Sequence, residues 1–126
     1  MKSRESKEMY LKSIYLLQEA GVNVHMVDVA AYLGFTKSSV SVAMKKLENE
    51  GLVTVCQGKK LSLTEKGTDI AISVVEKSRF FTEGLIALGV PKTIAEQDAC
   101  RIEHVLSEES FEAVKVYFAK HHLFPH

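Results

Sequence analysis

The fold of this chain is decided by the stretch Thr36-Lys37-Ser38-Ser39-Val40-Ser41-Val42-Ala43-Met44-Lys45-Lys46-Leu47-Glu48-Asn49-Glu50, which Gly51 closes. Thr36 is a typical N-cap, and Gly51 is a typical helix stop. Apolar and small side chains recur at helical spacing and form an inward stripe, Val40, Ala43, Met44 and Leu47. The other faces carry small, polar or basic side chains, which a helix in the major groove of DNA needs to approach base edges and phosphates. The stretch therefore predicts a recognition helix.

The segments around this helix predict a winged helix-turn-helix. Two further helices are expected before it, over residues 7–17 and 27–33, with glycines at their ends. After Gly51 the apolar residues alternate on both sides of Gln57-Gly58-Lys59-Lys60, which predicts a β-hairpin with two lysines at its tip. The alternative is a generic α+β fragment with a solvated hairpin, but the order, spacing and charge placement agree on the winged helix.

The rest of the chain is predicted to be helical. Helices are expected from Thr64 to about Leu88, from Pro91 to Val105 and from Ser107 onward. They carry more apolar surface than one small winged helix needs, which favours a dimerisation unit. The expected fold is therefore mainly α, with a winged helix-turn-helix and a two-stranded β wing in residues 1–66, followed by a helical dimerisation domain in residues 67–126.

Composition and charge exclude several classes of protein. The chain has 126 residues, of which 46% are hydrophobic and 25% charged, so a folded globular domain is expected. No apolar run is long enough to cross a bilayer and no secretory signal is present, which predicts a cytoplasmic protein that needs no membrane. The two cysteines suit reduced thiols. No nucleophile has a paired base, so neither an enzyme nor a small-molecule substrate is expected.

The net charge is zero, but the charges are unevenly distributed. Residues up to Lys66 include ten Lys or Arg and seven Asp or Glu, whereas the later residues include six and nine. A basic first half and an acidic second half suit DNA at one end and a cation or partner subunit at the other.

One candidate metal site stands out in the acidic half. Cys100, Glu103 and His104 occupy positions i, i+3 and i+4 of one expected helix, so their side chains share a face. A thiolate, a carboxylate and an imidazole at this spacing can converge on one cation, with a further ligand from elsewhere. On the residues alone, a solvated Glu–His pair and a cysteine that packs as a small core residue is the commoner interpretation.

Two separated segments resemble a known family. Glu8-Met9-Tyr10-Leu11-Lys12-Ser13-Ile14-Tyr15 and Ala99-Cys100-Arg101-Ile102-Glu103-His104-Val105-Leu106-Ser107 resemble the signature stretches of the diphtheria toxin repressor family of iron- and manganese-dependent regulators. The similarity spans about residues 6–109, including Val40-Ser41 and Glu50-Gly51-Leu52-Val53. The resemblance implies a metal-dependent transcriptional repressor that binds double-stranded operator DNA as a homodimer.

The resemblance also implies a ligand set. In the iron-responsive branch of the family, a methionine of the first helix joins a cysteine, a glutamate and a histidine of the dimerisation helix. The corresponding residues here are Met9, Cys100, Glu103 and His104. Soft sulfur ligands favour Fe(II), with Co(II), Ni(II), Zn(II) or Mn(II) as other divalent candidates.

The chain departs from the family in three places. Met9, Lys12 and Ser78 stand where the manganese branch has acidic residues and a histidine, which argues against a binuclear manganese site. The ancillary site of the iron branch corresponds to Ser78, Glu96 and Thr82, so it is expected to be absent or rebuilt. Longer relatives carry an SH3-like domain, which is expected to be lacking in a chain of this length.

The expected DNA contacts lie on the recognition helix and at the tip of the hairpin. They comprise Thr36, Lys37, Ser38, Ser39, Val42, Lys45, Lys46, Lys59 and Lys60, with four of the lysines, at 37, 45, 59 and 60, mainly at phosphates. His25 is interpreted as a surface residue. The C-terminal histidines His121, His122 and His126 are interpreted as a solvated end rather than a second metal cluster.

Two alternative functions stay open at this point. One is a winged helix that binds DNA without metal and responds to a small ligand or to oxidation at Cys100. The other is a winged-helix protein-interaction module that does not bind DNA, which the zero net charge suggests.

Overall fold

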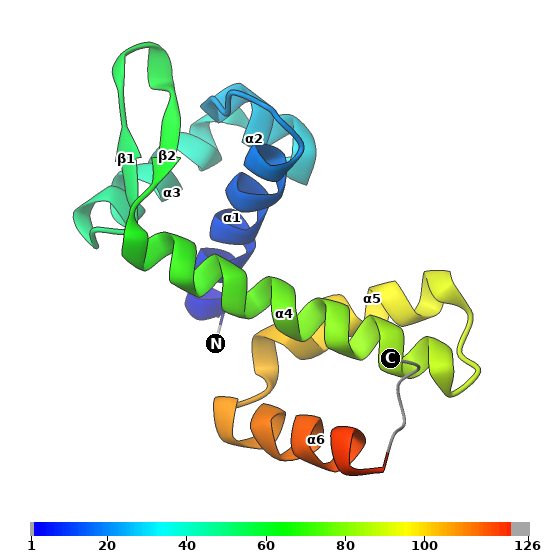
Figure 1. The fold of residues 1–126 in the computed structure, drawn as a ribbon. Coiled ribbons are helices and arrows are strands. Elements are labelled where there is room, and N and C mark those ends of the chain that lie inside the picture. The colour runs from blue at the N-terminus through cyan, green and yellow to red at the C-terminus, as the bar shows by residue number, and fades with distance from the viewer. Residues whose placement is uncertain (1, 122–126) are drawn as a thin grey trace. The chain divides into compact units, whose positions relative to one another are not determined.

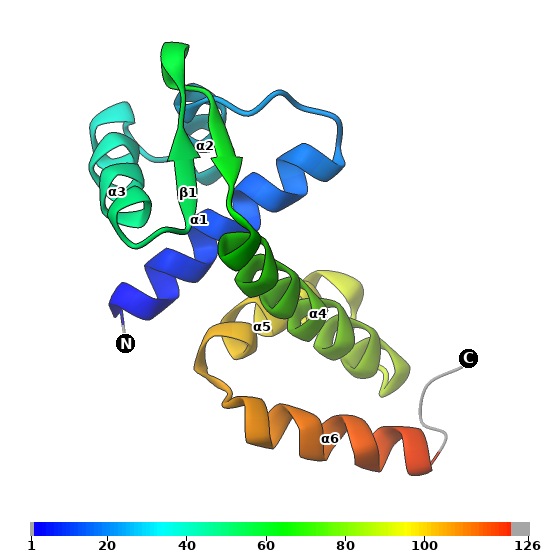
Figure 2. The same ribbon diagram turned by 60° about the vertical axis from the view of Figure 1, so that its left-hand side comes forward.

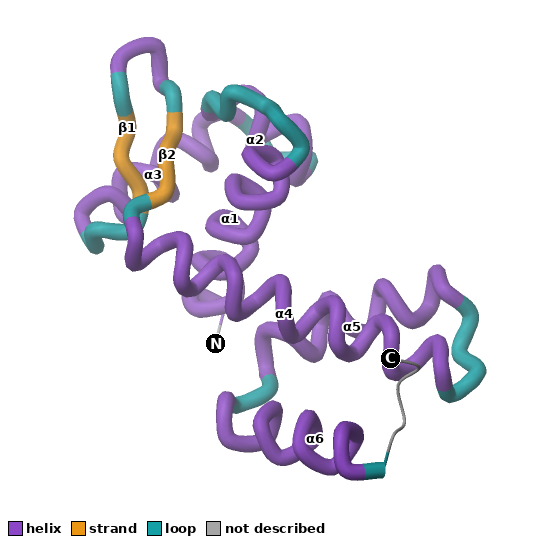
Figure 3. The backbone as a smooth tube through the Cα atoms, viewed as in Figure 1, coloured by secondary structure: helices purple, strands orange, loops and turns teal. Residues whose placement is uncertain are grey.

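The computed structural model describes residues 2–121, with side chains from residue 6 onward. In this range the chain forms six α-helices, one short 3-10 turn and one antiparallel pair of strands. Figures 1 and 3 show how these elements follow one another along the chain. The elements are α1 (Lys2–Glu19), α2 (Met26–Leu33), α3 (Lys37–Asn49), β1 (Val53–Val55), the 3-10 turn (Gln57–Lys59), β2 (Leu61–Leu63), α4 (Glu65–Ala87), α5 (Lys92–Val105) and α6 (Glu108–Lys120). The expected mainly α fold, with a winged helix-turn-helix followed by helices, is confirmed.

The chain divides into two compact units. Residues 2–73 form the first, and the second begins at Val74. The described residues contain no helix with both the length and the apolar character that a membrane crossing requires.

Helix caps that the sequence predicts determine where α2 ends and α3 begins in the helix-turn-helix. Gly34 ends α2 in the left-handed conformation, with φ of 74°, and its N–H donates to the carbonyl of Ala30 at 2.9 Å. Thr36 caps α3, because its Oγ1 accepts a hydrogen bond from the N–H of Ser39 at 3.1 Å. The predicted cap of the recognition helix is therefore confirmed. The first helix is longer than expected, since it begins at Lys2 and continues to Glu19.

The wing is a short hairpin joined to the segment before α2. Val53 pairs with Leu63 and Val55 with Leu61 in an antiparallel register. The N–H of Leu61 also donates to the carbonyl of Val24 at 2.8 Å, which attaches β2 to the chain ahead of α2. In Figures 1 and 2 the two strands and their connecting turn project beyond the helices of the first unit.

The core of the first unit orients the recognition helix. Val40, Met44 and Leu47 of α3 are buried, as the stripe predicted, whereas Ala43 is only partly buried. They belong to one cluster with apolar residues of α1, α2 and the wing, among them Leu11, Ile14, Val29, Leu52 and Leu61. This packing directs the opposite face of α3 to solvent.

The second unit has an aromatic core. Phe111 of α6 is 1% exposed, and its ring centroid lies 5.5 Å from that of Phe80 and 6.0 Å from that of Phe81 in α4. Ala95 and Ala99 bury one face of α5. Because this face of α5 is buried, packing fixes the position of the helix and of the residues in its last turn.

Candidate metal centre and nucleic-acid interface

The last two turns of α5 bring three potential ligands together. Cys100, Glu103 and His104 each offer one ligand atom, and these atoms all lie within 4.8 Å of one another. Ligands bonded at roughly 2.0–2.3 Å to one ion can be up to about 4.5 Å apart, so the spacing is close to that of a formed site. Among the residues that the structure describes, this is the only cluster of three or more His, Cys, Asp or Glu with such a spacing.

Burial makes this cluster unlike a chance surface group. Glu103 is fully buried and His104 is 6% exposed, whereas Cys100 is exposed. The Oε2 atom of Glu103 lies 3.0 Å from Nε2 of His104. A carboxylate is costly to bury unless it is paired or bound to a cation. The donor set combines sulfur, oxygen and nitrogen, and it therefore fits a divalent transition metal.

Met9, the fourth expected ligand, lies on a different part of the chain. It is a half-buried residue of α1, in the first compact unit, whereas the other three belong to the second. Its participation in the site stays a prediction.

The residues that correspond to the ancillary site of the iron branch are a serine, a threonine and a glutamate, and the described part of the chain contains no second cluster of three or more His, Cys, Asp or Glu ligands. Ser78 and Thr82 are half-buried on α4, and Glu96 is exposed on α5.

Of the C-terminal histidines, His121 is exposed and stacks on Tyr117 with ring centroids 4.0 Å apart. His122 and His126 lie outside the described residues.

Every residue expected to contact DNA is exposed. The set is Thr36, Lys37, Ser38, Ser39, Val42, Lys45, Lys46, Lys59 and Lys60. Val42 is 72% exposed, although the same helix buries Val40 completely. The face of α3 opposite the core is therefore small, polar and basic, and the wing adds two lysines. This is the surface chemistry that a phosphate backbone attracts.

A small pocket lies between the wing, α2 and the start of α3. Its volume is about 250 Å³, and its lining includes Lys37 and Lys59, together with His25 and Ser41. Sequence analysis did not assign His25 or Ser41 to any site. His25 precedes α2, and its backbone N–H donates to Oδ2 of Asp28 at 2.8 Å. Asp28, three residues further on, is the signal that could have marked His25 as the start of a helix.

A second, larger groove lies between α1 and α3. It has a volume of about 460 Å³, and its lining includes Tyr10, Val42 and Lys46. At this groove Nζ of Lys7 lies 2.8 Å from Oε1 of Glu50. The hydrogen bond from Lys7 lowers the pKa of Glu50, and the positive charge of Lys7 adds to this effect. Burial raises the pKa of Tyr10.

Two family models match adjacent parts of the chain. Residues 3–61 match the model described as iron dependent repressor, N-terminal DNA binding domain. Residues 64–126 match the model described as iron dependent repressor, metal binding and dimerisation domain.

Several known proteins are similar to this chain. The iron-dependent repressor IdeR of Mycobacterium tuberculosis is 38% identical over 106 residues, which cover 83% of the chain and 46% of IdeR. The transcriptional regulator MntR of Escherichia coli is 33% identical over 119 residues, which cover 94% of the chain and 76% of MntR. The chain spans about half the length of several of these curated relatives.

Solved structures agree with the sequence matches. A manganese-dependent transcriptional repressor in complex with manganese matches with a TM-score of 0.80 and 26% identity, covering 90% of this chain and 52% of that protein. The manganese regulator SloR matches with a TM-score of 0.77 and 29% identity, covering 90% and 53%. Because the two family models together span almost every residue, the chain belongs to the iron-dependent repressor family, a family of metal-dependent transcriptional regulators and not of enzymes.

Proposed function

We propose that this protein is a transcriptional repressor that binds operator DNA as a homodimer when it holds Fe(II) or a similar divalent transition metal. The observation that carries this proposal is the convergence of Cys100, Glu103 and His104 at the end of α5, with two of the three side chains buried. Membership of a metal-dependent family supports it. In this proposal residues 1–66 bind DNA and residues 67–126 bind metal and dimerise.

The metal centre is proposed to consist of Met9, Cys100, Glu103 and His104. The bound ion supplies a cross-link between the first helix and α5. Two sulfur atoms among four ligands favour Fe(II) over Mn(II), because thiolate and thioether are soft donors. Manganese-dependent relatives have the same fold, so the preference for iron rests on the donor set alone.

The homodimer is proposed to form through the second unit. Large apolar side chains on its helices and connections are exposed in the single chain, namely Ile86, Leu88, Ile94, Val105, Val116 and Tyr117. Exposed apolar surface of this kind is typical of a subunit interface. A dimer would present two recognition helices to half-sites about 34 Å apart, one turn of the duplex.

The switch requires only a modest preference of the metal for the DNA-competent form. An ion at 100 times its dissociation constant stabilises the form that binds it by about 2.7 kcal/mol, which corresponds to roughly 100-fold in DNA affinity. This free energy would drive one step, in which the separation between the two recognition helices of the dimer becomes fixed.

A titration of operator DNA, selected from a random duplex library, tests the proposal. Under reducing, anaerobic conditions we expect Fe(II) or Co(II) to raise DNA affinity by roughly 100-fold, and His104→Ala to abolish this gain. Binding that needs no metal and is unchanged in His104→Ala would contradict the proposal. Lys45→Ala should reduce the salt dependence of binding, whereas Lys92→Ala, an exposed lysine of α5, should not.

A second candidate function is that of a regulator that senses oxidation rather than metal. The exposed Cys100 thiol beside the buried His104 supports it. Metal stoichiometry on the reduced protein separates the two. About one ion per chain supports the metal sensor, and none supports the oxidation sensor.

A further inference from the structure

The second unit contains a buried lysine that the metal centre does not use directly. Lys77 of α4 has a side chain that is only 3% exposed. Lysine is almost never buried to this extent unless its charge is paired. The identity of its partners therefore indicates which part of the fold requires the charge.

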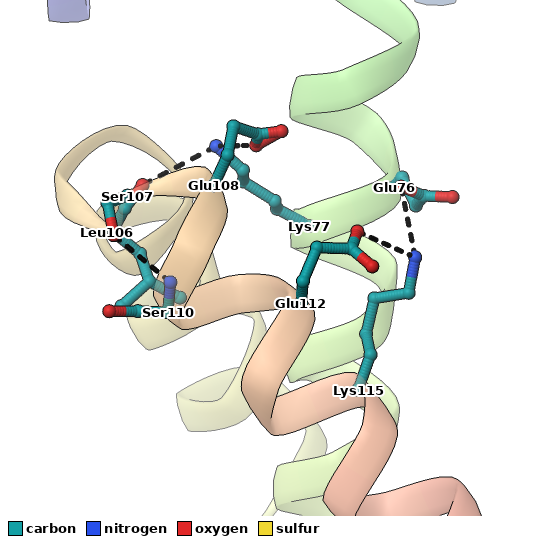
Figure 4. A network of polar contacts seen from close by, with 8 residues as sticks. All are labelled: Glu76, Lys77, Leu106, Ser107, Glu108, Ser110, Glu112 and Lys115. Atoms are coloured by element: carbon teal, nitrogen blue, oxygen red, sulfur yellow. Dashed lines mark hydrogen bonds and ion pairs between the residues drawn. The ribbon is translucent and has the colours of Figure 1, made fainter.

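Two polar partners of Lys77 lie at the connection between α5 and α6, and the centroid of the Phe111 ring lies 6.0 Å from its Nζ. Nζ of Lys77 is 2.8 Å from Oε2 of Glu108, in the first turn of α6, and donates a longer hydrogen bond of 3.4 Å to the carbonyl of Leu106. Between them Ser107 caps α6 by accepting from the N–H of Ser110 at 3.1 Å. Figure 4 shows the lysine reaching from α4 to this connection.

This connection immediately follows the metal ligands. The helix α5 ends at Val105, one residue after His104, and Leu106 is its C-cap. The last turn of a helix lacks intrahelical partners for its carbonyl groups and opens easily unless other groups hold it. Glu103 and His104 are both in that turn, so their positions depend on how firmly the connection is held.

We propose that Lys77 is a positioning residue for the metal centre: by binding Leu106 and Glu108 it holds the last turn of α5, and so keeps Glu103 and His104 in place for the ion. This inference rests on the proposed function. Groups that orient metal ligands from outside the coordination shell typically change metal affinity by roughly 10- to 100-fold when removed. Because Lys77 acts through the backbone, we expect the lower end of that range.

The test compares Lys77→Met with Lys115→Met in the full chain. Lys115 belongs to the same group of polar contacts, with its Nζ 3.7 Å from Glu76 and 3.4 Å from Glu112, but it lies further along α6 and is one-third exposed (Figure 4). Co(II) is the probe, because its absorption spectrum reports ligand geometry as well as affinity. We expect Lys77→Met to bind Co(II) about tenfold more weakly with an altered spectrum, and Lys115→Met to match the wild type.

The outcomes for the wild type and for Lys77→Met separate the proposed function from this inference. A wild-type chain that binds no Co(II) overturns the proposed function and this inference with it. Equal affinity and equal spectra in the wild type and Lys77→Met overturn this inference alone, even where the metal-free variant melts at a lower temperature. If Lys77→Met loses its helical circular dichroism, Glu108→Gln is tested in its place. The Glu108 side chain is 62% exposed, so this substitution removes the ion pair without disturbing the core. Weaker Co(II) binding by Glu108→Gln supports the inference, and unchanged binding overturns it.

Discussion

The Oε2 atom of Glu103 lies 3.0 Å from Nε2 of His104, and both side chains are buried in the last turn of α5. A carboxylate loses most of its hydration in such a place, so burying its charge costs free energy unless polar partners or a cation offset the loss. A cation bound between the two side chains would add an attraction for this buried charge. A site held in place by packing is also better prepared for its ligand.

Replacing Glu103 with glutamine lets the effects on metal binding and on folding be measured separately. Glutamine keeps the shape and can still hydrogen-bond to His104, but it removes the buried charge. We expect Glu103→Gln to weaken Co(II) binding by about 100-fold or more, because a ligand is lost rather than an outer group. The metal-free variant should keep its fold but melt at a lower temperature, because removing one member of a buried polar pair is destabilising. Calorimetric titration and thermal melting measure the two effects.

Glu109→Gln is the matched control for this experiment, because Glu109 is exposed in the first turn of α6. It should leave Co(II) affinity unchanged. A Glu103→Gln variant that binds Co(II) as tightly as the wild type would show that this carboxylate is not a ligand.

Cys100 should determine which metals the site prefers. Its thiol is exposed, unlike its two neighbours in the cluster, and it supplies the soft donor of α5. Serine in its place offers a hard oxygen, so Cys100→Ser should lose at least about tenfold in Co(II) affinity while retaining more of its affinity for Mn(II). The thiolate-to-cobalt charge-transfer absorption should disappear, although the Met9 thioether is still present. Cys56→Ser, at the other exposed cysteine, should keep this absorption, and its loss in both variants or in neither would contradict the assignment.

The helix-turn-helix and the shared helix face of Cys100, Glu103 and His104 were predictable because both depend on local sequence. The burial of Glu103 and His104 was not, because it depends on how α5 packs. Thr36 and Ser107 cap their helices through side-chain hydrogen bonds to residues three positions later, which sequence spacing encodes. The i, i+3, i+4 pattern likewise fixes the ligand face of α5. The Lys77–Glu108 pair was not predictable, because it joins residues that are distant in sequence and depends on how α4 packs beside α6.

The stability effect of replacing Gly67 is a second property that local sequence predicts wrongly. It lies in the first turns of α4, where helix propensity alone predicts that alanine would stabilise the chain by about 1 kcal/mol. In the structure a Cβ atom at this position would be 2.0 Å from the carbonyl oxygen of Leu52. The carbonyl belongs to the backbone just before the wing and accepts a hydrogen bond from the N–H of Thr64. Gly67 therefore permits the start of α4 to pack directly against the chain entering the wing.

Gly67→Ala should consequently destabilise the protein, with the opposite sign to the propensity effect. We expect a loss of at least about 2 kcal/mol in the free energy of unfolding, because the clash is with backbone that cannot move aside without breaking a hydrogen bond. Urea denaturation measures this loss. Lys66→Ala, at the exposed neighbouring residue, should change stability by less than about 0.5 kcal/mol. Equal or greater stability of Gly67→Ala would contradict the close approach.

The Lys7–Glu50 ion pair predicts a pH effect with a definite sign. Lys7 lowers the pKa of Glu50 from its ordinary value of 4.5, chiefly through a hydrogen bond to the carboxylate. A carboxyl group whose pKa is lower in the folded state than in the unfolded state adds stability above the unfolded pKa. This contribution is lost as the pH falls through the folded pKa, so the relevant range lies below about pH 4.5.

Lys7→Met should raise the pKa of Glu50 towards 4.5, and the carboxyl carbon resonance of Glu50 in an NMR titration measures the change. Lys66→Met is a graded control, because Lys66 acts on Glu50 only through its charge and has the smallest effect among the contributing lysines. The shift should therefore be larger in Lys7→Met, and added salt should reduce it, since the carboxylate is exposed to solvent. Identical titration of Glu50 in the wild type and Lys7→Met would mean that the pair does not persist in solution. In that case the pair would not connect α1, which carries Met9, to the end of the recognition helix.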